Sequence, residues 1–169
     1  MSPSTQLTEG FIRGNGFDLR LAQAGEIRAV AVAAGATATD RIDALEANHL
    51  EWWRTHGYGV WIVADAAEGS SLGWCGLRPN DTPSDPELMY VIVPAARGRG
   101  LASGAAQRII TFAFSGSHIR SIWAATDLSN LASQKVMQRV GMAFERHGQV
   151  HGLESVIYRI HRSNAPDSP

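Results

Sequence analysis

The chain has 169 residues, of which 44% are hydrophobic and 18% charged, and its 15 basic and 16 acidic side chains give a formal net charge of −1. This composition is typical of one globular domain of ordinary size and excludes an extended disordered chain. The near-neutral charge argues against nucleic-acid binding as the main role, because no excess of positive charge exists to neutralise a run of phosphates.

The chain is expected to begin with a strand and two helices. Residues 17–21 alternate apolar and polar side chains, as a half-buried strand does. Residues 24–34 are rich in alanine and indicate a helix. Asp40 is the expected N-cap of a second helix that extends to about residue 55. The residues expected on its apolar face are Ile42, Leu45, Ala47, His49, Leu50 and Trp53.

Three strands are expected next, at residues 58–64, 71–77 and 87–93. The loop of residues 78–86 carries three prolines, an asparagine and two aspartates, and is a connection. Residues 87–93 are apolar after Glu87 and β-branched at their end, which is typical of a buried central strand. The proline that follows is expected to end this strand.

Helices and strands alternate in the second half of the chain. Their expected positions are helix 101–114, strand 119–126, helix 130–139 and a final pair of strands at 142–147 and 154–160. Gly141 stands where a glycine closes the C-terminus of the short helix. The order β-α-α-β-β-β-α-β-α-β-β predicts an α/β (α+β) protein with a mixed sheet flanked by helices.

Cys75 is the only cysteine, which excludes an intrachain disulfide and a zinc site built from several thiolates, and no metal is expected. Residues 1–10 lack the apolar core of a signal peptide, and no stretch approaches the roughly 20 apolar residues that span a bilayer. We therefore expect a cytoplasmic protein with no membrane partner. It should form a single domain, 1–169, with flexible ends at 1–10 and 163–169.

The segment between the fourth expected strand and the next helix carries a chemical signal. It reads Pro-Ala-Ala-Arg-Gly-Arg-Gly-Leu-Ala from position 94 to 102. A helix N-terminus leaves backbone N–H groups without intrahelical partners and carries partial positive charge. Gly98 and Gly100 permit close approach of a ligand, and Arg97 and Arg99 add positive charge. These features predict an anion site suited to a pyrophosphate.

Other interpretations of this segment remain open. Taken alone, it is also compatible with a Gly-rich turn that carries two solvated arginines. The dinucleotide pattern G-x-G-x-x-G fails only at Ser103, and Asp127 lies near the position of a ribose-binding acid. However, the 42 residues after Asp127 are too few to complete a six-stranded doubly wound domain. The Walker tripeptide Gly-Lys-Ser/Thr does not occur.

Two motifs resemble one known family. The spacing Arg97-x-x-Gly100-x-Ala102 is similar to the acetyl-CoA pattern Q/R-x-x-G-x-G/A of the GNAT superfamily of N-acetyltransferases. The sequence Asn-Leu-Ala-Ser from position 130, with Val-Met at 136–137 and Val-Gly-Met at 140–142, resembles the subfamily that includes ribosomal-protein N-terminal acetyltransferases. The resemblance implies a GNAT-like, mostly antiparallel sheet of about seven strands, splayed between the fourth and fifth strands.

The resemblance also implies acetyl-CoA as co-substrate and direct attack by a primary amine through a tetrahedral intermediate. The acceptor would be a small-molecule amine or a protein N-terminus, and a homodimer is compatible with this family. An acyl-CoA-binding module of the same fold without turnover is the alternative. The residues implied in cofactor binding are Tyr90, Val91, Val93, Arg97, Gly98, Arg99, Gly100, Leu101, Ala102, Ser103 and Asn130.

Two residues are the expected catalysts. Glu87 is the candidate general base, and an exposed strand end is its alternative interpretation. Many superfamily members protonate the thiolate with a tyrosine, but this position is Met137, so the resemblance implies Ser133 as the donor. Ser133 is otherwise a first-turn helix residue that bonds locally. If Glu87 is not the base, His147, His151 or a water chain would have to serve.

Overall fold

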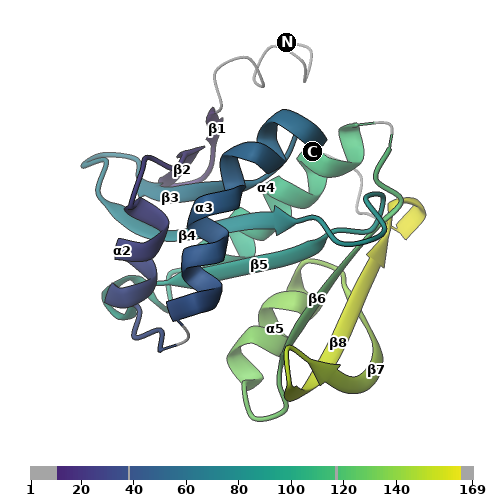
Figure 1. Ribbon diagram of the computed structural model, residues 1–169. Coiled ribbons are helices and arrows are strands. Elements are labelled where there is room, and N and C mark those ends of the chain that lie inside the picture. The colour runs from purple at the N-terminus through teal and green to yellow at the C-terminus, as the bar shows by residue number, and fades with distance from the viewer. Residues whose placement is uncertain (1–10, 38, 117, 165–169) are drawn as a thin grey trace.

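The computed structural model describes residues 11–37, 39–116 and 118–164, which form an eight-stranded sheet with helices on both faces (Figure 1). The strands are β1 (Phe11–Arg13), β2 (Phe17–Leu21), β3 (Val60–Asp65), β4 (Ser71–Arg78), β5 (Glu87–Ile92), β6 (Ser121–Asp127), β7 (Ala143–Val150) and β8 (Leu153–His161). The helices are α2 (Glu26–Ala33), α3 (Thr39–His56), α4 (Leu101–Ser115) and α5 (Leu131–Arg139), with short 3-10 turns η1 (Pro94–Ala96) and η2 (Arg162–Asn164).

The strand order is β1-β2-β3-β4-β5-β6-β8-β7. Neighbouring strands are antiparallel throughout, except for the parallel pair β5 and β6. The mixed, mostly antiparallel sheet is therefore confirmed. A doubly wound nucleotide-binding domain is excluded, because its sheet is mostly parallel.

Every predicted helix and strand is present, but several details differ. The structure adds β1, a three-residue strand too short to carry a period, and the sheet has eight strands rather than about seven. Asp40 lies in the first turn of α3, which begins at Thr39, so the prediction that Asp40 is the N-cap was wrong. Ala47 and Leu50 are exposed, so the buried stripe of α3 is narrower than predicted. The predicted flexible ends lie outside the described residues, apart from positions 163 and 164 in η2.

Two hydrophobic cores lie on opposite faces of the sheet. One packs α4 and α5 against it and includes the large buried side chains Trp61, Leu77 and Ile109. The other packs α2 and α3 against the opposite face and contains Ile62 and Trp74. Successive residues of one strand therefore serve different cores, as the period of two requires.

The sheet opens between β5 and β6. These strands share one registered pair, Glu87 with Trp123, and then diverge (Figure 1). Near this pair the backbone N–H of Arg120 donates to the carbonyl of Ser84 at 2.8 Å. The predicted splay is confirmed. It also explains why Tyr90 and Val91 are only half-buried in a strand that the sequence predicted to be fully covered.

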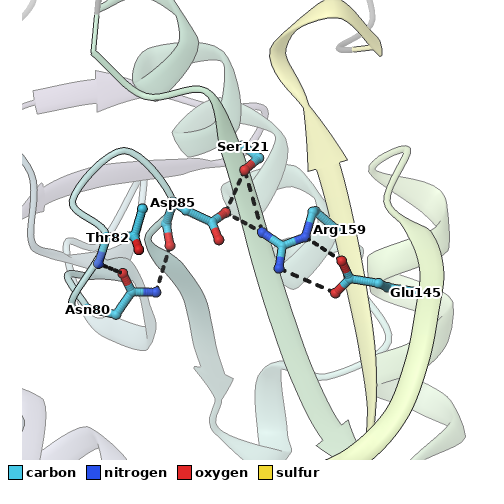
Figure 2. A network of polar contacts seen from close by, with 6 residues as sticks. All are labelled: Asn80, Thr82, Asp85, Ser121, Glu145 and Arg159. Atoms are coloured by element: carbon cyan, nitrogen blue, oxygen red, sulfur yellow. Dashed lines mark hydrogen bonds and ion pairs between the residues drawn. The ribbon is translucent and has the colours of Figure 1, made fainter.

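A polar cluster holds the closed end of the splay together (Figure 2). Asp85, in the loop before β5, accepts hydrogen bonds from the Ser121 hydroxyl of β6 at 2.6 Å and from the Arg159 guanidinium of β8. Arg159 also donates to Glu145 of β7 at 2.8 Å. The side-chain amide of Asn80 donates to the Asp85 carbonyl at 2.8 Å and orders the loop. One carboxylate therefore joins the two halves of the sheet.

None of the helices within the described part of the chain has both the length and the hydropathy needed to cross a membrane.

Candidate active site

The loop between β5 and α4 has the geometry of an anion site. Gly98 and Gly100 adopt φ of 78° and 75°, a left-handed conformation that favours glycine. The first intrahelical bond of α4 runs from the amide of Gly104 to the carbonyl of Gly100 at 2.9 Å. The amides of residues 101–103 precede that bond and lie at the positive end of the helix dipole. Apart from the adjoining residues of the chain, no heavy atom of the described residues lies within 4 Å of a Cβ built on Gly98 or Gly100, so the loop faces open space.

The two arginines of this loop contact backbone carbonyls and a carboxylate of neighbouring elements. Arg97 donates from Nε to the carbonyl of Ile92 at 3.0 Å and from its terminal nitrogen to the carbonyl of Ala34, at the end of α2, at 3.2 Å. Arg99 pairs with Asp65 of β3 at 3.5 Å. Both guanidinium groups add charge near the loop, and Arg97 also fixes the end of β5.

Helix α5 borders the splay on the side of β6. The Asn130 side chain accepts a hydrogen bond from the amide of Ser133 at 3.1 Å, which makes Asn130 the N-cap. At the other end, Gly141 has φ of 87°, and Met142 donates to the carbonyl of Met137 at 3.0 Å. This is a Schellman motif, so the predicted C-terminal cap is confirmed.

Tyr90 of β5 and Ser133 of α5 meet across the splay. The Tyr90 hydroxyl lies 2.7 Å from Ser133 Oγ and 3.1 Å from the Ser133 carbonyl oxygen. Burial raises the pKa of Tyr90 to about 12, although the hydrogen bond with Ser133 opposes this effect. The Tyr90 hydroxyl is therefore protonated at neutral pH.

One cavity of about 590 Å³ joins the loop, the end of β5 and the start of α5. The predicted site residues that line it are Tyr90, Val91, Arg97, Gly98, Gly100, Leu101, Ala102, Ser103, Asn130 and Ser133. Val93, Arg99 and Glu87 do not line it. Val93 instead donates its amide to the carbonyl of Leu72 at 2.9 Å. The structure thus brings ten predicted residues to one surface, and their roles there stay predictions.

Sequence reasoning missed the face of α5 that lines the same cavity. Ala132, Val136 and Arg139 lie along it at spacings of four and three residues, which place them on one side of a helix. That periodicity was the available signal. A neighbouring cavity of about 360 Å³ shares four lining residues with the first, Gly100, Leu101, Ser103 and Arg139, and adds Arg99 among others.

Glu87 of β5 is buried and ion-paired, and its role as the general base stays a prediction. Its side chain is buried, so it is not an exposed strand end. Arg78, its cross-strand neighbour on β4, donates from Nε to Glu87 Oε2 at 3.0 Å and also from a terminal nitrogen. Glu87 shares the strand face of Met89 and Val91, whereas Tyr90 points to the opposite face. The carboxylate is therefore an ion-paired group on the α2/α3 side of β5.

His151 completes this charged group from the turn between β7 and β8. Its Nε2 contacts the Arg78 guanidinium and lies 3.7 Å from Glu87 Oε2. Burial and the nearby charges of Arg78 and Arg41 lower the pKa of His151, against the pull of Glu87. Since a guanidinium only donates, Nε2 is the accepting nitrogen of a neutral ring. His147, the other histidine considered, is exposed on β7 and packs against the ring of Phe144 at 5.1 Å.

Gly104 of α4 lies where a side chain would meet the core. A Cβ at this position would lie 3.0 Å from the ring of Phe17, which is itself buried. The aromatic ring of β2 therefore fills the space that a larger side chain on α4 would need.

Comparisons with known proteins agree with this geometry. Residues 19–143 match the family model described as Acetyltransferase (GNAT) domain. The uncharacterized protein YkkB of Bacillus subtilis is 31% identical over 94 residues, which are 53% of this chain and 55% of YkkB. The chain thus spans about half the length of this curated relative.

Solved structures share the fold over most of the chain. An acetyltransferase from Agrobacterium tumefaciens has a TM-score of 0.77 at 19% identity, covering 89% of this chain and 94% of its own. RimL, a ribosomal alpha-N-protein acetyltransferase in complex with coenzyme A, has a TM-score of 0.72 at 14% identity, covering 89% of this chain and 97% of its own.

Proposed function

The chain belongs to the GNAT acetyltransferase family, and from this premise we propose that it transfers an acetyl group from acetyl-CoA to a primary amine. The observation that carries the proposal is the cavity of about 590 Å³ that connects the amides of residues 101–103 to the splayed edge of β5. A pyrophosphate suits the first part of this cavity, and an extended amide-bearing arm suits the second.

In the proposed reaction the protein binds the cofactor, polarises the acetyl carbonyl and accepts a proton. The unpaired edge of β5 offers backbone groups to the pantetheine amides, as an added strand would. An amide near Tyr90 and Val91 polarises the acetyl carbonyl. The amine then attacks the carbonyl carbon, the tetrahedral intermediate collapses, and the C–S electron pair leaves with the thiolate. The proton of the amine passes to a base, for which Glu87 is the candidate.

We propose that the amine approaches from the α2/α3 side of β5. The α4/α5 side of β5 is occupied by the Tyr90 ring, Ser133 and the cavity. The α2/α3 side holds the charged group of Arg78, Glu87 and His151. A small-molecule amine and a protein N-terminus are the two acceptor classes. RimL, which acts on a protein alpha-amine, supports the second class through its fold alone.

Two measurements test the proposal. Calorimetry with acetyl-CoA, coenzyme A and NAD should show binding of both CoA compounds and not of NAD. Release of free thiol from acetyl-CoA should then depend on the amine in a panel of amino acids, polyamines and short peptides. Binding without thiol release for any amine would support the acyl-CoA-binding module instead. Lack of CoA binding would refute both functions.

A further inference from the structure

The side chain of Tyr90, and not only its backbone, lies at the proposed acetyl-transfer site. Its ring leaves β5 on the face of α4 and α5, crosses the splay and ends at the first turn of α5. Both Tyr90 and Ser133 line the 590 Å³ cavity. The cavity is therefore lined, beside the edge of β5, by two hydroxyl-bearing residues whose hydroxyl groups contact each other.

The Tyr90 hydroxyl can donate its hydrogen bond to an acceptor other than Ser133. The phenol has a single hydrogen, and two oxygen atoms of Ser133 lie within reach of it. The Ser133 carbonyl lies inside α5 and accepts the amide four residues later, so it does not depend on the phenol. Ser133 Oγ–H can donate to the Tyr90 oxygen while the phenol O–H turns to a third acceptor. Such a chain strengthens its terminal donor.

We infer that the Tyr90 hydroxyl donates the hydrogen bond that stabilises the departing CoA thiolate, and that Ser133 positions and polarises this hydroxyl. The inference rests on the proposed acetyl transfer and adds a catalytic side chain to it. Ser133, which the family resemblance implies as the donor, becomes a positioning residue that acts through Tyr90.

The proton stays on the tyrosine in this step. Burial raises the pKa of Tyr90 to about 12, whereas an ordinary thiol has a pKa of about 8.5. Full transfer from phenol to thiolate is therefore unfavourable by roughly a thousandfold. The C–S bond breaks with its electron pair on sulfur, the phenol O–H stabilises that charge, and the thiolate takes a proton from water after release.

The test combines turnover with a readout that needs no acceptor. Tyr90→Phe, Ser133→Ala and the double variant are compared with the wild type for kcat and for coenzyme A affinity. We expect Tyr90→Phe to lower kcat by about 10²-fold with little change in Kd, and Ser133→Ala to have a smaller effect. The double variant should match Tyr90→Phe, because Ser133 acts through the phenol.

The second readout is the pKa of the thiol of bound coenzyme A, followed by the ultraviolet absorbance of the thiolate. We expect this pKa to be lower on the wild type than in free coenzyme A and to return toward the free value in Tyr90→Phe. An unchanged thiol pKa, or additive effects of the two substitutions, would overturn the role of Tyr90 while the acetyl transfer stands. If coenzyme A does not bind the wild type, the proposed function itself fails.

Discussion

Glu87 is buried beside Arg78 and His151, and this setting determines what its substitution tests. Glu87→Gln removes the charge that pairs with Arg78 inside a low-dielectric site, so we expect the free energy of unfolding to fall by about 1–3 kcal/mol. If Glu87 is the base, the same change should also abolish the rise of kcat/KM with pH that this carboxylate causes. Urea unfolding and a pH–rate profile separate these two effects.

Arg78→Gln is the matched control for this experiment. It breaks the same ion pair, so the free energy of unfolding should fall by a comparable amount. The carboxylate is retained, so the rise of kcat/KM with pH should persist. If Glu87→Gln lowers stability but the rise of kcat/KM with pH persists, Glu87 is a structural partner of Arg78. The base would then have to be sought elsewhere, in a water chain or in His151.

His151 links pH to stability with a definite sign. Its pKa is lowered in the folded chain by burial and by Arg78 and Arg41, with Glu87 opposing them. The unfolded chain therefore binds a proton more readily, so stability is fully present above the unfolded pKa of about 6.5 and declines as pH falls below it. Burial lowers the pKa of His49 as well, which acts in the same direction.

We expect the free energy of unfolding, measured in urea, to be lower at about pH 5 than at about pH 7.5, and His151→Asn to reduce this difference. Asparagine tolerates the positive φ of 52° at this position, so the turn should survive the change. A pH dependence in His151→Asn equal to that of the wild type would contradict the assignment.

A negative charge at the N-terminus of α4 should stabilise the helix but weaken the binding of coenzyme A. Ala102 lies in the first turn and lines the cavity. Ala102→Glu places a negative charge near the positive end of the helix dipole, which stabilises by about 0.3–1 kcal/mol. The same charge would face the pyrophosphate, so we expect the affinity for coenzyme A to fall by more than tenfold while Tm is kept or raised.

Ala102→Gln has nearly the same volume without the charge and is the control. A modest loss of affinity in Ala102→Gln and a large one in Ala102→Glu would identify charge repulsion at the loop. Equal losses would indicate that bulk alone blocks the cavity, and unchanged affinities in both variants would sink the assignment of the loop. Calorimetry and thermal unfolding supply both quantities.

Local signals account for the parts of the site that the sequence predicted. Gly98 and Gly100 mark a left-handed loop before a helix, and Asn130 and Gly141 mark the ends of α5. Each feature depends on residues within a few positions along the chain. The contact of Tyr90 with Ser133 spans 43 positions and that of Arg78 with His151 spans 73, so no local pattern reports them. Asp40 was misplaced because the ends of helices are the least certain part of a local signal.

At the scale of the whole molecule, the splay divides the sheet into two halves, whose facing strands share one registered pair. Strands β1 to β5 carry α2, α3 and α4, and strands β6 to β8 carry α5 (Figure 1). The cavity lies where the halves separate, and its walls come from both of them. The angle between the halves therefore determines the width of the cavity. At the closed end the halves are joined by the cluster around Asp85 (Figure 2) and by the backbone bonds of Arg120 and Trp123 to the loop before β5.

Asp85→Ala should act on both stability and binding for this reason. It removes the acceptor of Ser121 and Arg159, and within the described residues it leaves the half-buried guanidinium with Glu145 as its carboxylate partner. We expect the free energy of unfolding to fall by about 1–3 kcal/mol. We also expect weaker binding of coenzyme A, because the two walls of the cavity lose their fixed separation.

Glu145→Ala is the matched comparison, since it removes a carboxylate from the same guanidinium without crossing the splay. Glu145 and Arg159 lie on the antiparallel pair β7 and β8, within one half of the sheet. It should therefore lower stability and leave the affinity for coenzyme A within about twofold, a change below 0.5 kcal/mol. If both variants weaken binding in proportion to their loss of stability, the Asp85 cluster supports the fold in general. A selective loss of affinity in Asp85→Ala would instead show that this carboxylate sets the width of the cavity.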